Sequence, residues 1–190
     1  MSGPGGVFAA GDPEPLPITI RLETPGDEPG VRRVNEAAFP GPEEADIVDE
    51  IRRLGPIGWQ SIVALNLTGD IVGHLLLSPC ALEDETGGVV GEVLALGPVA
   101  VLPPVQFRGV GSALIHAALS LAIARGVPAV VLLGYPAYYP RFGFVPARSV
   151  GLEPPAQAWP DAAWMARLLP AWGMGLRGTV RYPKAFEPFA

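Results

Sequence analysis

The sequence has few of the residues that build thiol or metal chemistry. Its 190 residues include one cysteine, Cys80, and two histidines, His74 and His116. A single cysteine excludes an intramolecular disulfide and fits a reducing compartment, so we expect a cytoplasmic protein. No H-x-x-H or C-x-x-C spacing occurs, and the sequence predicts no metal site. We expect Cys80 to fill apolar space and both histidines to be structural, with a place for His74 in an acceptor cleft as the alternative.

Charged residues are also scarce, at 17% of the chain against 49% hydrophobic residues, which is typical of a folded protein. The longest apolar segment of helical period, residues 110–124, is too short to cross a bilayer, so we expect no membrane partner. Residues 1–17 contain no lysine or arginine and are rich in glycine and proline, unlike a signal peptide. We expect a flexible leader over residues 1–17 and one domain over residues 18–190.

Charge is distributed unevenly along the chain. Up to Glu92 there are sixteen acidic residues and five arginines, whereas the remainder holds three acidic and eight basic residues. A basic second half suits a polyanionic ligand. The acidic first half either attracts a cationic acceptor or merely solvates a surface helix over residues 43–50. The net charge of −6 argues against nucleic acid as a partner.

The most informative segment is residues 99–114, VAVLPPVQFRGVGSAL. A strand-like run ends at Pro103 and is followed by Arg108 and two glycines that lead into a helix. Glycines let a backbone approach a ligand closely, and a helix N-terminus and an arginine both favour phosphate. The third glycine of a Rossmann motif is absent, and the only lysine, Lys184, lies outside any P-loop.

A second motif follows the apolar strand predicted over residues 128–134. It reads YPAYYPRFGF over residues 135–144 and places Tyr139 four residues before Gly143. Gln106–Gly111 resembles the Q/R-x-x-G-x-G/A loop that binds the acetyl-CoA pyrophosphate in the GNAT superfamily of N-acetyltransferases. Residues 135–144 resemble that family's tyrosine–x–x–x–Gly-Phe signature. Residues 178–186 are similar to the tail of a subgroup of small bacterial acetyltransferases, so the resemblance covers residues 18–186.

The resemblance implies an α/β (α+β) GNAT fold with a mixed central sheet that is splayed at its middle strands. Its element order is β–α–α–β–β–β–α–β–α–β. Hydrophobic periodicity agrees with this order. It predicts helices over residues 27–39, 43–54 and 109–125, and strands over residues 18–23, 61–67, 71–81, 91–102 and 129–134.

The resemblance also implies direct transfer of an acetyl group from acetyl-CoA to a primary amine. Pantetheine would pair with the strand over residues 96–101, where Pro98 predicts a bulge because it has no N–H. The backbone N–H of Leu96, Gly97 or Val99 would stabilise the oxyanion. The implied cofactor contacts are Leu96, Gly97, Val99, Ala100, Val101, Gln106, Phe107, Arg108, Gly109, Val110, Gly111, Ser112, Ala113 and Tyr138.

Two residues are candidates for proton transfer. Tyr139 matches the family tyrosine that protonates the departing thiolate; the alternatives are Tyr138 in that role, or Tyr139 as a packing residue only. Glu92 is the candidate general base, and a water chain to bulk solvent is its alternative.

The acceptor site is less well specified. Aromatic residues could form apolar walls for a small-molecule amine, or they could close the core or a homodimer interface: Phe39, Trp59, Trp159, Trp164 and Trp172. Two other functions stay open at this stage. One is a non-catalytic acyl-CoA-binding module, and the other is an acyltransferase that uses a longer acyl-CoA or a protein lysine.

Overall fold

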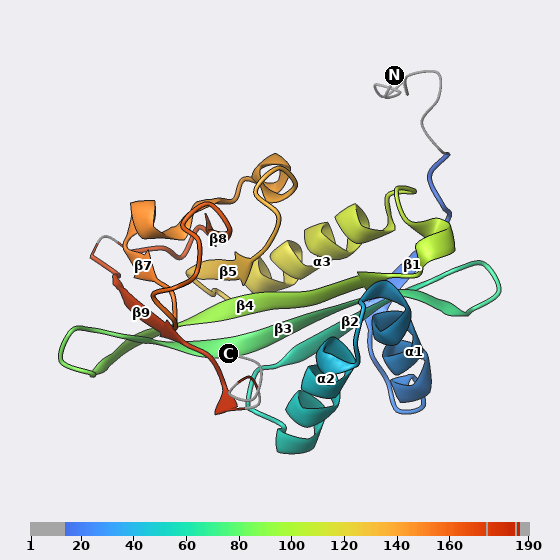
Figure 1. The fold of residues 1–190 in the computed structure, drawn as a ribbon, viewed down its shortest axis with the longest axis horizontal. Coiled ribbons are helices and arrows are strands. Elements are labelled where there is room, and N and C mark those ends of the chain that lie inside the picture. Colours follow the sequence, from blue (N-terminus) through green and yellow to red (C-terminus); the bar gives the residue numbers. More distant parts are fainter. Residues whose placement is uncertain (1–13, 174, 185, 187–190) are drawn as a thin grey trace.

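A computed structural model describes residues 14–173, 175–184 and 186, which form one mixed sheet with helices on both faces (Figure 1). The elements follow the order that the family resemblance implies. They are β1 (Thr19–Leu22), α1 (Glu28–Ala38), α2 (Glu43–Leu54), β2 (Gln60–Leu65), β3 (Ile71–Glu83), β4 (Val89–Val101), η1 (Pro103–Val105), α3 (Val110–Ala124), β5 (Ala129–Leu133), η2 (Tyr139–Phe142), β6 (Val145–Pro146), η3 (Ala147–Val150), β7 (Leu152–Glu153), β8 (Trp164–Leu168) and β9 (Gly178–Arg181).

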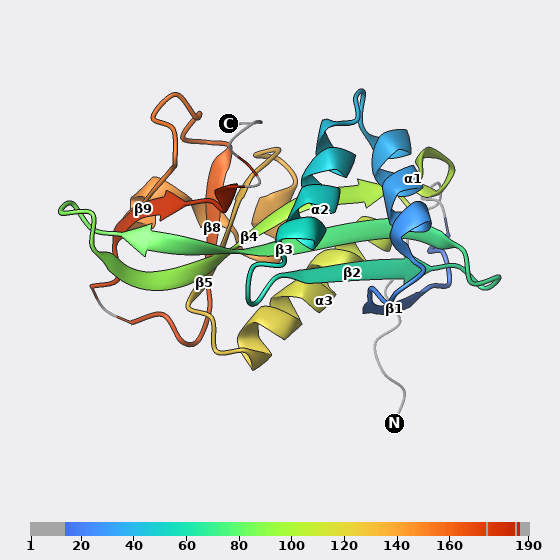
Figure 2. The ribbon, with the colours of Figure 1, turned by 90° about the horizontal axis from the view of Figure 1, so that it is seen from below.

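The sheet runs in the order β1-β2-β3-β4-β5-β8-β6, with β9 paired to the far end of β3 and to β7. Its long central pair, β3 and β4, is antiparallel, whereas β4 and β5 are parallel and are joined through α3. Helix α3 covers one face, and α1 and α2 cover the other (Figure 2). The predicted GNAT architecture is therefore confirmed. The helix expected after β5 is a single 3-10 turn. Pro140 lies near its start, and Gly143, which has a left-handed backbone conformation, ends it.

The core is divided between the two faces by the period-two alternation of the strands. On β3, Leu75 and Leu77 pack with α3, and Leu76 between them packs with α1 and α2. All three are fully buried. Each such leucine contributes roughly 1.5–3 kcal/mol of burial free energy. The alternation thus fixes both helical layers on one sheet.

Strand β4 carries a bulge where Pro98 predicted one. Leu75 pairs with Val99 and Leu77 pairs with Leu96, so Gly97 and Pro98 together lie opposite Leu76 alone. The Gly97–Pro98 peptide is cis. Strand β5 pairs with β4 only at Leu94 and Ala95, ahead of the bulge. The second half of β4 is therefore free of β5, and the predicted splay of the middle strands is confirmed.

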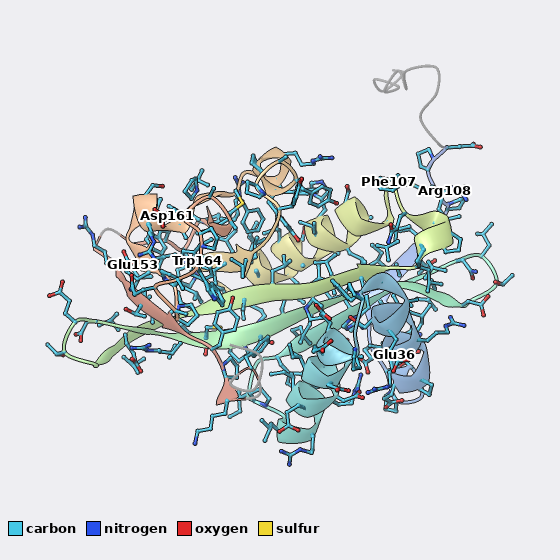
Figure 3. The ribbon with its side chains drawn as sticks, viewed as in Figure 1. Glu36, Phe107, Arg108, Glu153, Asp161 and Trp164 are labelled. Carbon is cyan, nitrogen blue, oxygen red and sulfur yellow. The ribbon has the colours of Figure 1, made fainter. Side chains whose placement is uncertain are left out.

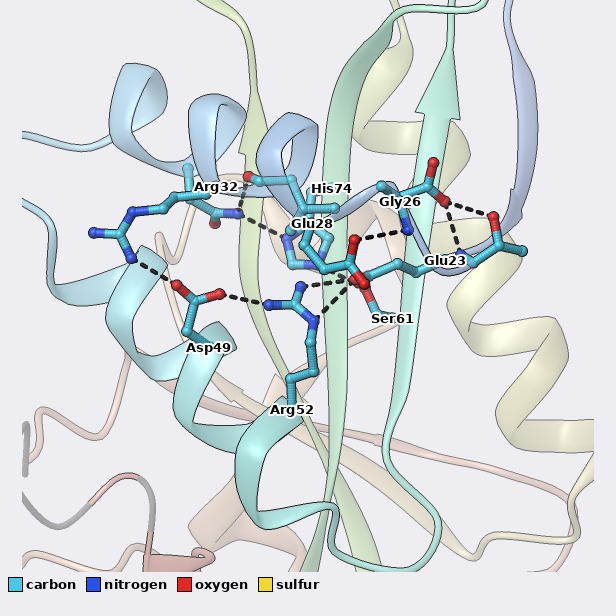
Figure 4. A network of polar contacts seen from close by, with 12 residues as sticks. Glu23, Gly26, Glu28, Arg32, Asp49, Arg52, Ser61 and His74 are labelled. Carbon is cyan, nitrogen blue, oxygen red and sulfur yellow. Dashed lines mark hydrogen bonds and ion pairs between the residues drawn. The ribbon is translucent and has the colours of Figure 1, made fainter.

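A buried polar chain ties α1 and α2 to the sheet (Figure 4). Arg52 donates to Glu23 from Nε at 3.0 Å and from Nη2 at 2.7 Å, and the Ser61 hydroxyl donates to the same carboxylate. His74 lies 3.0 Å from Ser61 through Nε2 and 3.0 Å from the Asn35 amide nitrogen through Nδ1. Burial, with the charge of Arg52, lowers the pKa of His74 to about 3, so its imidazole is neutral. These hydrogen bonds give His74 the structural role that the sequence favoured.

Candidate active site

A cleft of about 610 Å³ opens where the free half of β4 meets the start of α3 and the η2 turn. It also reaches the C-terminal end of α1. Residues from five separate parts of the chain line it: Pro15, Ala38, Phe39, Val99, Val101, Gln106, Phe107, Arg108, Gly109, Gly111, Ser112, Tyr138, Tyr139 and Arg141. The structure thus gathers the predicted phosphate loop and the predicted tyrosine around one cavity.

The loop before α3 has an unusual backbone. Phe107 has a φ of 62° and Gly109 a φ of 83°, both left-handed. Turns that contain left-handed residues can direct successive N–H groups to one side, a geometry that binds anions. For Phe107 the conformation costs roughly 1–2 kcal/mol. Phe107 is 90% exposed, so packing within the described residues does not explain the cost. Figure 3 shows Phe107 and Arg108 together beside the start of α3.

Helix α3 adds its own open N–H groups to this site. Gly109 is its N-cap and has no side chain with which to cap the first turn. Because Gly109, Gly111 and Ser112 line the cleft, the unpaired N–H groups of this first turn and the positive end of the helix dipole lie beside it. Gln106 holds the loop in place, because its Nε2 donates to the Val101 carbonyl at 3.0 Å. The loop from Gln106 to Gly109 and the first turn of α3 together form a phosphate cradle that could bind a diphosphate.

A segment ahead of β1 is also part of the cleft. Leu16 N donates to the Arg108 carbonyl at 3.0 Å, and Arg108 Nε donates to the Glu14 carbonyl at 2.9 Å. Pro15, between them, lines the cavity. Residues 1–13 of the predicted leader lie outside the described residues, but residues 14–16 form a strap on the phosphate loop. Sequence reasoning missed the strap because main-chain pairing leaves no side-chain pattern.

The two tyrosines lie at different depths. Tyr139 packs over Gly134, where an added Cβ would come within 2.3 Å of its ring, and meets Phe144 edge-on at 5.7 Å. Burial raises the pKa of Tyr139 to about 12, so its phenol stays protonated at neutral pH. Tyr138 reaches α3, because its hydroxyl would lie 3.3 Å from a Cβ placed on Gly111. A glycine at position 111 therefore leaves room for this ring.

Not every predicted cofactor residue turns its side chain to the cleft. Val99 and Val101 line it, whereas the Ala100 side chain between them is buried toward α1 and α2. Leu96 and Val110 are buried in the core against α3, and Gly97 and Ala113 are not lining residues. Contacts from these positions would be made by the main chain. The physical reason is that side chains on β4 alternate between the two faces of the sheet and that Val110 lies on the face of α3 that packs against the core.

Comparison with known proteins agrees with this geometry. A family model described as "Acetyltransferase (GNAT) domain" matches residues 19–147. The chain belongs to the GNAT acetyltransferase family. Two relatives from Escherichia coli K12 are named uncharacterized N-acetyltransferases. YjhQ is 30% identical, and the match covers 86% of this chain and 91% of the length of YjhQ. YhbS is 31% identical over 90% of this chain and 100% of its own.

Solved GNAT structures extend the match to three dimensions. The crystal structure of E. coli YhbS in complex with CoA has a TM-score of 0.81 and 28% identity, covering 96% of this chain and 98% of that one. A GNAT acetyltransferase from Brucella melitensis in complex with acetyl-CoA has a TM-score of 0.70 and 31% identity. That match covers 89% of this chain and 97% of the Brucella chain.

Glu92 lies away from this GNAT cleft. It is exposed and lines a separate hollow of about 700 Å³ together with Arg125 and Leu176. Val99 is seven positions further along the same strand, roughly 23 Å at the usual rise per residue. The structure therefore does not bring the predicted base to Tyr139. None of the predicted phosphate-binding residues lines this hollow.

The aromatic candidates for acceptor walls lie at three places in the structure. Phe39 lies in the cleft. Trp164 is fully buried, donates its indole N–H to the Leu152 carbonyl at 2.8 Å, and meets Trp159 edge-on at 5.4 Å. Trp172 packs against the same cluster, and Trp59 packs against α1 and α2 beside a different hollow. Trp164 lies at the end of the molecule opposite Phe107 (Figure 3).

Cys80 is buried, and burial raises the pKa of its thiol well above the usual range, which makes it a poor nucleophile. Within the residues that the structure describes, no three metal-ligating side chains gather. No helix of the described chain has the length and apolarity to span a membrane.

Proposed function

We propose that the protein is an acetyl-CoA-dependent N-acetyltransferase that transfers the acetyl group directly to the primary amine of a small molecule. The observation that carries this proposal is the single cleft that joins the phosphate loop, the free half of β4 and Tyr139. The names of YjhQ and YhbS, and the CoA species in the two GNAT crystal structures, support it.

The residues fit an acyl-CoA. The loop from Gln106 to Gly109 and the first turn of α3 would hold its diphosphate. Main-chain groups of Leu96–Val101, which lack β5 as a partner beyond Ala95, would pair with the pantetheine arm. Holding both substrates on these rigid elements supplies the near-attack geometry of the reaction.

The reaction is attack of an amine on a thioester, which forms an oxyanion and releases CoA as a thiolate. In this chain the N–H groups at Leu96, Gly97 and Val99 are the candidate donors to the oxyanion, since Pro98 has none. One such donor contributes about 2.7–4 kcal/mol to the transition state. The β4 bulge is what leaves this stretch of main chain open.

Proton transfer is divided between Tyr139 and solvent. The protonated phenol of Tyr139 lines the cleft and is the hydrogen-bond donor to the departing sulfur. Among the described residues that line the cleft there is no carboxylate and no histidine. The proton of the attacking amine therefore leaves through water, the alternative that the sequence left open beside Glu92.

The test combines ligand binding with turnover. Acetyl-CoA at 100 times its Kd should stabilise the protein by about 2.7 kcal/mol in a thermal-shift series, whereas NAD and ATP should have little effect. An amine screen read by thiol release should then find turnover. Tyr139→Phe should lower kcat at least tenfold and leave acetyl-CoA affinity near its original value, because only the hydroxyl is lost.

Two outcomes of this test contradict the proposal. Stabilisation by acetyl-CoA without thiol release across many amines would indicate a non-catalytic binding module. Stronger stabilisation by longer acyl-CoAs would indicate a different acyl donor.

A further inference from the structure

The cleft is an exception in an acidic protein. Among the described residues that line it, only Arg108 and Arg141 are charged, although the chain as a whole carries a net charge of −6. Arg108 belongs to the phosphate loop. Arg141 comes from the η2 turn, more than thirty residues further along the chain, and has no part in the loop. A second cation in the cleft indicates a second anionic group on the ligand.

Contacts within the protein hold the guanidinium of Arg141 in place before any ligand binds. Its Nε donates to the Tyr138 carbonyl at 2.9 Å, and its central carbon lies 4.5 Å from the centroid of the Tyr138 ring. These contacts reduce the rotamer entropy that the side chain would lose on binding a ligand. Neither Nη atom makes a hydrogen bond to any described residue, so both remain available.

Tyr138 separates Arg141 from the phosphate cradle. The hydroxyl of this ring reaches Gly111 in the first turn of α3, and the guanidinium lies over the ring itself. The cradle and Arg108 are sufficient for one diphosphate. Arg141, across the tyrosine, is placed for a separate phosphate. CoA has such a group, the 3′-phosphomonoester on its ribose, in addition to its diphosphate.

We infer that Arg141 binds the 3′-phosphate of CoA and makes the protein select CoA species over their 3′-dephospho forms, an inference that rests on the proposed function. Because Arg141 is exposed, the contact is a charge-assisted hydrogen bond in water. Its expected effect is about tenfold in affinity, which salt should weaken.

The experiment is calorimetric titration of the full chain with acetyl-CoA and with 3′-dephospho-acetyl-CoA. The original protein should bind acetyl-CoA about tenfold more tightly. Arg141→Ala should bind acetyl-CoA about tenfold more weakly than the original protein does. It should bind the dephospho form as tightly as the original protein does, so the preference disappears. Arg53→Ala removes one positive charge from the exposed surface of α2 and should retain the full preference.

The inference is overturned if the original protein binds both ligands equally, or if Arg141→Ala weakens both by the same factor. The second result would assign Arg141 to the shared diphosphate. Arg141→Lys, which keeps the charge without the planar fork, serves if the alanine variant does not fold, and should show a reduced preference. Failure of the original protein to bind either ligand would contradict the proposed function instead.

Discussion

The arginines on the α1/α2 face and those in the cleft have different partners. On the α1/α2 face, Arg32 pairs with Asp46 and Asp49 and joins α1 to α2, and Arg52 pairs with Glu23 and joins α2 to the end of β1. In the cleft, Arg108 and Arg141 each use Nε to bind a main-chain carbonyl and keep their Nη atoms unbonded within the described residues. An arginine paired with a carboxylate stabilises the fold, whereas one anchored by a carbonyl remains able to bind an anion. Substitutions on the two sides should therefore affect different measurements.

The largest expected effect is on the cleft side. Gly109→Asp places a carboxylate where the phosphate loop should meet a diphosphate, and like charges at such a distance cost several kcal/mol. Acetyl-CoA affinity, measured by calorimetry, should fall about a thousandfold. Gly109→Ala is the matched control, because it imposes the same left-handed strain on a Cβ that has open space around it. If the alanine variant loses as much affinity, backbone strain and not charge is responsible.

The next effect is on the helix side. Arg52→Ala leaves the buried Glu23 carboxylate, which is 8% exposed, without its cation. The free energy of unfolding should fall by about 3 kcal/mol, with acetyl-CoA affinity unchanged. Arg53→Ala, one residue along and exposed, should leave stability as it is in the same denaturant titration. An equal loss of unfolding free energy in the two variants would mean that the pair of Arg52 and Glu23 stabilises the fold no more than an exposed ion pair does.

An effect of pH, smaller per pH unit, belongs to the same side. The unfolded imidazole of His74 binds a proton below its ordinary pKa of 6.5, whereas the folded one has a pKa of about 3. Between these values the unfolded state binds more protons, so acidification destabilises the protein by about 1.4 kcal/mol per pH unit through this residue. His74→Gln should lose that part of the slope in denaturant titrations from pH 6.5 to 4. An unchanged slope would assign the acid sensitivity to carboxylates.

Local patterns in the sequence accounted for most of the fold. Helical and strand periods placed α1 to α3 and the central strands, and Pro98 marked the bulge, because these features are dictated by residues close together in sequence. The phosphate loop was predictable for the same reason. The gathering of Tyr139 with the loop depended on family resemblance, since periodicity says nothing of how η2 approaches α3.

What the sequence did not reveal depends on distance in space. Glu92 shares a strand with the predicted oxyanion donors, yet a strand is extended and separates them widely. Arg141 is one of twelve arginines, and only its place in the lining of the cleft, outside the phosphate loop, distinguishes it. The tryptophans could have been binding walls, but Trp164 is buried, and the partly buried Trp159 and Trp172 pack against the same cluster away from the cleft.

The strap of residues 14–16 affects how the protein should be handled. Because Glu14 and Leu16 are hydrogen-bonded to Arg108, any peptide joined ahead of them is tethered at the mouth of the cleft. A short flexible tether raises the local concentration of its cargo to the millimolar range. An acidic affinity tag at this end would act as a built-in competitor of the cofactor, and an uncharged one would not.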